Sequence, residues 1–219
     1  MGNIGVARVN REVMESKVMR KFIGSLVIVS SIFFLTACDA GIAAQVGDSK
    51  ISQSTVQNKV SEILAERRKF DTSQMQVNVG EELNRSELRF LLISLIFEKI
   101  AAENNIKITQ AMKDARKAEV YGQVGGVDQL PQALVGAQMA PSDFNLYIQS
   151  LLISEALVEK AKAAGVDDAN TGAAIQTLVK ALAKKIGIKI NPQYGAWDPS
   201  AADVVTFDAA GTAVKTLTA

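Results

Sequence analysis

Apolar residues recur with helical spacing through most of the chain after residue 52, and they predict about six helices. In the first, Val56, Val60 and Ile63 share one face, and Ser52 or Ser54 can cap its start. The second is apolar around most of its circumference, which is typical of a helix buried on several sides. The first helix is expected to end near residue 68, and the others to span residues 81–104, 110–121, 127–138, 142–164 and 171–186.

Strand-like alternation occurs only near the two ends of this helical region. Val46 and Ile51 flank a Gly-Asp-Ser turn and predict a small hairpin, while Ile188 and Ile190 alternate with polar residues after the last helix. Neither stretch is stable alone as a sheet, so we expect the two to pair. Trp197 is then expected to anchor the closing segment on the helices. The predicted fold is mainly α, a single domain with a small β element that joins its own ends.

The N-terminal region has a different pattern. A basic start at Arg20 and Lys21 precedes sixteen uncharged residues, Phe22 to Ala37. As a helix they would extend about 24 Å, less than the roughly 30 Å hydrocarbon core of a bilayer. A basic start, a short apolar run and small residues at its end are typical of a secretory signal peptide.

The signal peptide ends at the only cysteine of the chain. Leu35-Thr36-Ala37-Cys38 resembles the bacterial lipobox, in which the cysteine is acylated and becomes the first residue after cleavage. The alternatives are a buried core cysteine and an uncleaved membrane anchor. The sequence has no histidine to activate the thiol, so nucleophilic chemistry by Cys38 is not expected. The resemblance implies a palmitoylated lipoprotein, anchored on the extracytoplasmic face of a bacterial cell membrane.

Replacement of Cys38 by serine tests the anchor. The Cys38→Ser variant is expected to accumulate as unprocessed precursor, because the acylated thiol is lost. Two or three acyl chains, at about 0.8 kcal/mol per buried methylene, give stable attachment where one chain does not. Membrane fractionation and mass spectrometry of the N-terminus measure this, and a variant processed and located like the wild type would exclude lipidation.

These features divide the chain into five parts. Residues 1–18 are interpreted as a misannotated or disordered extension, because Met19 would begin an ordinary signal peptide. Residues 19–37 are expected to form the signal peptide, 38–44 a lipidated tether, 45–207 the folded domain and 208–219 a frayed tail.

Composition and charge argue against several classes of function. From Cys38 onward the chain has 19 basic and 21 acidic residues, since five of the 24 basic and two of the 23 acidic residues come earlier. The sequence has no basic stripe of the kind that binds nucleic acid. It also has no group of residues that would serve as a nucleophile, an acid–base pair or a set of metal ligands, so neither an enzyme nor a cofactor is expected. Gly122, Gly125 and Gly126 lack the strand and the Gly-Lys-Ser/Thr of a phosphate loop.

Three stretches in a fixed order resemble the SurA/PrsA family of extracytoplasmic folding factors. They are QVGDSKISQSTV near the mature start, the helical region from LRFLLISLIFEKIAAENNIKIT to DFNLYIQSLLISEALVEK, and INPQYGAWDP near the end. The resemblance implies the SurA N-terminal chaperone module, related to that of trigger factor. Family members often insert a parvulin prolyl isomerase domain where this chain has only GVDDAN, and parvulin sites use histidines. The resemblance therefore implies chaperone function without isomerase activity.

The expected partners are unfolded or nascent secreted polypeptides, together with the membrane through the lipid on Cys38. The candidate peptide-binding residues are methionines and tyrosines at loop or helix-edge positions, because such side chains suit adaptable or amphipathic surfaces. The alternative for each is core packing. The alternative function is an interaction lipoprotein that docks one folded envelope partner. The candidates are Met75, Met112, Tyr121, Met139 and Tyr147.

Overall fold

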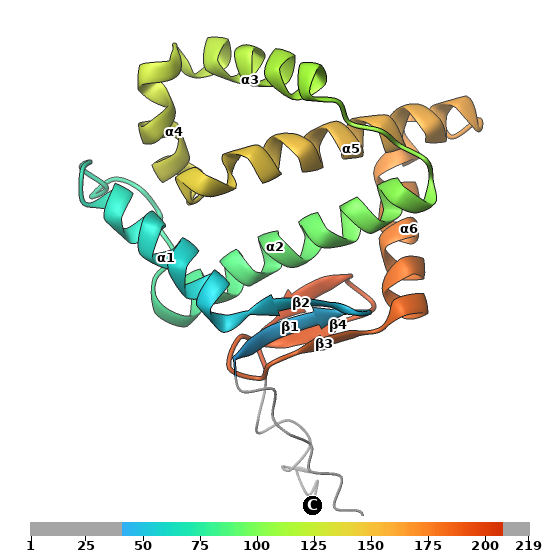
Figure 1. The fold of residues 1–219 in the computed structure, drawn as a ribbon, viewed down its shortest axis with the longest axis horizontal. Coiled ribbons are helices and arrows are strands. Elements are labelled where there is room, and N and C mark those ends of the chain that lie inside the picture. Colours follow the sequence, from blue (N-terminus) through green and yellow to red (C-terminus); the bar gives the residue numbers. More distant parts are fainter. Residues whose placement is uncertain (1–40, 208–219) are drawn as a thin grey trace, which may run out of the picture. The chain divides into compact units, whose positions relative to one another are not determined.

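The computed structural model describes residues 41–207, which lie within the compact unit Asp39–Ala219 (Figure 1). This part of the chain is mainly helical, with small antiparallel sheets, as the sequence predicts. The helices are α1 (Gln53–Arg67), α2 (Gly80–Glu103), α3 (Gln110–Val124), α4 (Leu130–Gly136), α5 (Phe144–Ala163) and α6 (Thr171–Ile186), with 3-10 turns at Val127–Gln129, Pro141–Asp143 and Asp168–Asn170. The strands are β1 (Ile42–Val46), β2 (Ser49–Ser52), β3 (Ile188–Ile190), β4 (Ala196–Asp198) and β5 (Asp203–Val205).

The start of α1 agrees with the capping residue expected from the sequence, whereas the bounds of the helices from α3 to α5 differ from those expected. The Ser52 hydroxyl accepts a hydrogen bond from the Thr55 N–H at 2.9 Å and caps α1. The third helix passes through Gly122, where a break was expected, and ends at Gly125, whose φ is 91°. The helix expected over 127–138 is a 3-10 turn followed by α4, and the helix expected from 142 starts with another 3-10 turn before α5.

The predicted pairing of the two ends of the domain is confirmed. β1 lies between β2 and β3 and is antiparallel to both, with Ala44 opposite Ile190 and Val46 opposite Ile188. Gly47 makes the β1–β2 turn with φ 59°, and its N–H donates to the Gly187 carbonyl at 3.0 Å. The tether was expected to extend to residue 44, but its last residues belong to the sheet, because β1 already begins at Ile42.

A second hairpin, β4–β5, was not predicted as such. It places Trp197 opposite Val204, and the indole packs half-buried against the main core, as expected for an anchor. Tyr194 is buried more deeply, with 1% of its surface exposed, and its hydroxyl accepts a hydrogen bond from Gln57 Nε2 at 3.3 Å. The closing segment is therefore held by two aromatic residues.

Alanine at Gly195 is expected to destabilise this hairpin. Gly195 has φ 130°, and a Cβ there would overlap the Val205 carbonyl oxygen. Strain of this kind lowers the free energy of unfolding by about 1–3 kcal/mol. The control is Gly122→Ala, which has open space inside α3 and should raise stability by about 0.5–1 kcal/mol. Urea unfolding measures both, and a Gly195→Ala protein as stable as wild type would contradict the hairpin geometry.

The elements stack in layers around α2. The three-stranded sheet packs on one side of α2, α5 packs on another, and α3 lies against α5 (Figure 1). The main core fills the space among the sheet, α1, α2, α5 and α6. A second apolar cluster, built on Leu134, Phe144, Ile148 and Leu152, joins α4 to α5. The sheet and α5 thus cover two sides of α2. The side chains of this helix that stay partly accessible are the candidates for a functional site.

Candidate functional site

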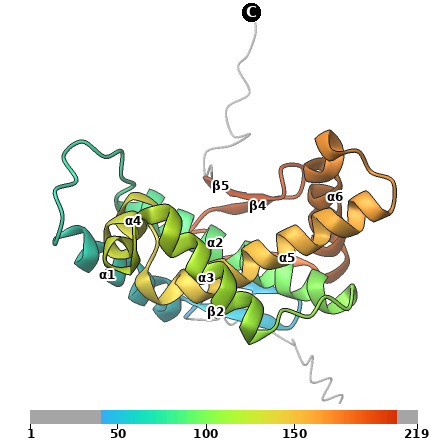
Figure 2. The same ribbon diagram turned by 90° about the horizontal axis from the view of Figure 1, so that it is seen from above.

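A stripe of half-buried apolar side chains runs along one face of α2. Phe90, Ile93 and Phe97 are three and four residues apart, which places them on the same side of the helix. Each packs against the main core without being fully covered. We call these three residues the α2 stripe. A pocket lies at each end of the stripe, and Figure 2 shows α4 toward one end of α2 and α6 toward the other.

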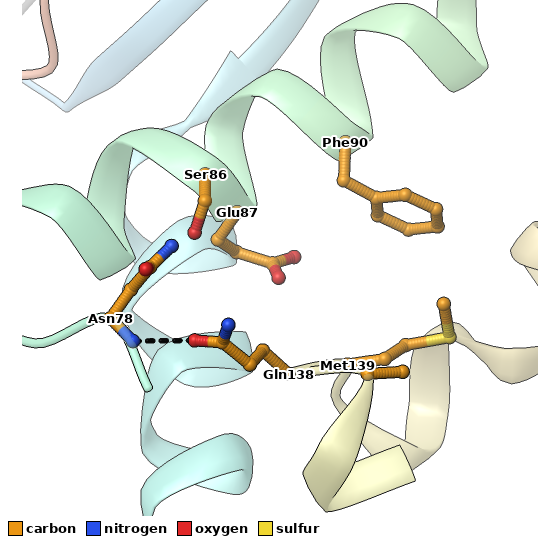
Figure 3. Close-up of a pocket in the computed structure, with 7 residues that line it drawn as sticks. Asn78, Ser86, Glu87, Phe90, Gln138 and Met139 are labelled. Carbon is orange, nitrogen blue, oxygen red and sulfur yellow. Dashed lines mark hydrogen bonds between the residues drawn. The ribbon is translucent and has the colours of Figure 1, made fainter. Parts of the chain in front are cut away.

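The first pocket, which we call the Glu87 pocket, has a volume of about 170 Å³ (Figure 3). That is well above the roughly 10–15 Å³ that one water molecule needs. Its walls come from the loop before α2, from α2 itself and from the chain that follows α4. The lining residues are Asn78, Ser86, Glu87, Phe90, Ala137, Gln138 and Met139.

The buried guanidinium of Arg67 fixes the polar wall of the Glu87 pocket. Arg67 Nη1 donates to the Asn78 carbonyl at 2.6 Å, and Nη2 donates to Gln138 Oε1 at 2.9 Å. The same Gln138 oxygen accepts from the Asn78 N–H at 2.6 Å. Burial lowers the pKa of Arg67. These bonds tie the end of α1 to the loop before α2 and to the turn after α4, where Gln138 has φ 56°.

Glu87, which lines this pocket, forms a pair of buried carboxyl groups with Asp143, which lies behind the lining. Glu87 is 4% exposed and Asp143 is 1% exposed. Burial, followed by the charge of Asp143 and a hydrogen bond with it, raises the pKa of Glu87 to about 8. Two carboxyl groups can share a hydrogen bond only if one carries a proton, so Glu87 is the protonated partner at neutral pH. Lys59 Nζ neutralises Asp143 from the other side, at 2.7 Å from Oδ1.

The second pocket, which we call the α6 pocket, has a volume of about 300 Å³ and lies among α2, α6 and the β4–β5 turn. Ile93 and Phe97 of the stripe form its base, and Ile175 and Val179 of α6 form a wall. The rim is polar, because Arg89 Nε lies 2.6 Å from Asp203 Oδ1. Gly172, Gln176, Ala201 and Ala202 complete the lining.

The candidate residues from the sequence do not form one site. Met139 lines the Glu87 pocket. Tyr121 stacks on Phe144, with ring centroids 5.9 Å apart, and packs with Tyr147 against the second apolar cluster, which is the core-packing alternative. Met112 is 40% exposed near the start of α3, and Met75 is half-buried in the loop before α2. Cys38 lies outside the described residues.

Sequence reasoning missed the α2 stripe and the Glu87–Asp143 pair. Nearly every turn of α2 is apolar, so the pattern does not reveal which side stays accessible. The signal for Glu87 was its spacing, since it lies four residues after Leu83 and four before Leu91, on the helix face that these two leucines bury. Asp143 is far away in sequence and comes close only through the α4–α5 connection.

Comparison with family models, with curated proteins and with solved structures finds no match to this chain. Within residues 41–207, no helix has both the length and the apolar character needed to cross a membrane. The same residues contain no group of three or more acidic or cysteine side chains that is arranged to hold a metal ion.

Proposed function

We propose that this protein is a membrane-anchored, ATP-independent chaperone that binds unfolded secreted polypeptides along the α2 stripe. The lipid on Cys38 would hold it on the extracytoplasmic face of the membrane, close to chains that emerge from the secretion channel. The proposal includes no catalytic step, and in particular no prolyl isomerisation. It combines the lipobox and the SurA/PrsA resemblance with the geometry of α2.

The observation that carries the proposal is the α2 stripe with a pocket at each end. Phe90 opens onto the Glu87 pocket, and Ile93 and Phe97 open onto the α6 pocket. Phe90 and Ile93 are one helical turn apart, so a single extended segment could place side chains in both pockets. Partly exposed aromatic and aliphatic side chains supply the apolar contact area for such a segment.

The shape of this surface favours a chaperone over an interaction lipoprotein that docks one folded partner. A folded partner typically buries one broad apolar patch, whereas an unfolded segment needs concave sites for separate side chains. Binding must also be weak enough for release without nucleotide hydrolysis. We therefore expect dissociation constants near micromolar, about −8 kcal/mol, for apolar and aromatic-rich peptides.

The test is suppression of aggregation by the chain from Asp39, which contains the whole described core. Near stoichiometric ratios it should slow the aggregation of an unrelated unfolding protein, because it lowers the free concentration of unfolded chains. It should leave the cis–trans rate of a prolyl peptide unchanged. Light scattering and a peptide isomerisation assay measure the two. A protein that binds no unfolded client, but holds one folded partner tightly, would support the docking alternative instead.

A further inference from the structure

We propose that the Glu87 pocket binds a cationic side chain, a lysine or an arginine, carried by the polypeptide segment that lies on the α2 stripe. The inference rests on the proposed function and names the chemistry of one binding position. The preferred client segment would then be apolar with one positive charge, not uniformly apolar. Three features of the pocket carry the inference: the direction of the Glu87 carboxyl group, the balance of charges around it, and the side chains on either side.

The Glu87 carboxyl group points into the space between Phe90, Gln138 and Met139 (Figure 3). Glu87 is only 4% exposed, and apart from the proton that it shares with Asp143 its carboxyl group has no hydrogen-bond partner at Oε1 among the described residues. Asp143 Oδ2 also lacks one within that part of the chain. A buried carboxyl oxygen without a donor is costly, and a ligand ammonium or guanidinium would supply what is missing.

Even with Arg67 in the polar wall, where it binds Asn78 and Gln138, the carboxyl groups around the pocket outnumber the cations. The carboxyl groups of Asp143 and Glu62 both act on that of Glu87. Lys59 is the one cation that acts on Glu87 among the described residues, and it is already bound to Asp143 and to the Ser142 hydroxyl. Ser142 in turn donates to Glu62 Oε2. In the free protein the deficit is met by a proton on Glu87, and a cationic side chain can take the place of that proton.

The apolar walls suit the rest of such a side chain. Phe90 and Met139 lie on either side of the space that the carboxyl group faces (Figure 3). An aromatic face attracts a cation within about 6 Å, and a thioether and a ring pack well against the methylene stem of lysine or arginine. A neutral apolar side chain would meet the same walls but would gain no ion pair with the carboxyl group. The pocket therefore distinguishes lysine from an uncharged chain of the same length.

Binding of the cation is coupled to loss of the Glu87 proton. When the cationic group enters, the proton leaves Glu87 to solvent and the carboxylate pairs with the ligand. Affinity for a cationic segment should therefore rise with pH through about 8, while affinity for a neutral segment should not. The groups that face Glu87 are Asp143 from the α4–α5 connection and Lys59 and Glu62 from α1.

The experiment compares two peptides on the chain from Asp39. Both are the same apolar octapeptide, with either lysine or its uncharged analogue norleucine at the centre, titrated calorimetrically at pH 6.5 and 8.5. We expect the lysine peptide to gain roughly tenfold in affinity between the two pH values and to release a proton on binding. The norleucine peptide should show neither effect. Glu87→Gln should abolish the preference for lysine, and Glu82→Gln, an exposed glutamate on the same helix, should retain it.

The outcomes separate the two proposals. Equal binding of both peptides at both pH values would overturn the cation site and leave the chaperone proposal standing. Binding of neither peptide would overturn the chaperone proposal, and the cation site with it. A lysine preference that survives Glu87→Gln would show that the charge is recognised elsewhere and would also overturn the assignment of this pocket.

Discussion

The protein is expected to lose stability as the pH rises from about 5 to about 8. Burial and the neighbouring Asp143 raise the pKa of Glu87 from its usual 4.5 to about 8 in the folded protein. Between these values the folded state keeps a proton that the unfolded state has released. Since stability falls with pH wherever the folded state binds more protons, the contribution of Glu87 is fully present below about 4.5 and is lost by about 8.

The expected loss is on the order of 2–4 kcal/mol, because each pKa unit corresponds to about 1.4 kcal/mol and part of the effect is shared with Asp143. The effect of Glu87 is easy to recognise between pH 5 and 8, since the sequence has no histidine that would titrate in this range. Urea unfolding of the chain from Asp39 at a series of pH values measures the slope.

Glutamine at position 87 should remove this dependence. The Glu87→Gln amide can still donate a hydrogen bond to Asp143, but it does not ionise. We expect a nearly level stability profile between pH 5 and 8 for this variant, and the wild-type slope for the matched control Glu82→Gln. A wild-type profile that is level or rises over this range would contradict the shared proton.

The second large effect is expected on peptide binding. Glutamine in place of Ile93 puts an amide among apolar side chains at the base of the α6 pocket, where a bound segment would bury it without a partner. Burying an unpaired polar group costs about 1–3 kcal/mol, so affinity for an apolar peptide should fall roughly tenfold or more. Fluorescence anisotropy with a labelled apolar peptide measures the change.

The control for this variant is Leu64→Gln on α1. Leu64 is 42% exposed and lines neither pocket, so the same substitution there should leave peptide affinity as it is. Unfolding curves for both variants establish that they remain folded. Equal losses from the two substitutions, or no loss from Ile93→Gln, would contradict binding along the α2 stripe.

Much of the fold could be predicted because local signals and the tertiary structure agree. Ser52 caps α1 as expected, Thr109 caps α3, Gly187 ends α6, and the alternation at Val46 and Ile188 predicted strands that do pair. The β4–β5 hairpin carries a weaker local signal. Its strands have only three residues each, and their pairing depends on the conformation of Gly195 and on contacts with α2.

The candidate site was harder to predict, because it depends on which faces the helices leave uncovered. Met139 was selected for its flexible side chain and does line a pocket, but Tyr121 and Tyr147 pack against the second cluster. In the sequence, Phe90 and Phe97 look like core residues. Only the arrangement of α4, α5 and α6 around α2 leaves them partly accessible.

Site-specific photo-crosslinking to a defined unfolded client tests the central claim most directly. A photoreactive amino acid is placed at Phe90, at Phe97 or at the control position Leu64, and the protein is mixed with a labelled, permanently unfolded polypeptide before irradiation. The account predicts crosslinks from Phe90 and Phe97 that an excess of apolar peptide competes away, and little or no crosslinking from Leu64. Crosslinks of equal yield from all three positions, or from Leu64 alone, would contradict the assignment of client binding to the α2 stripe.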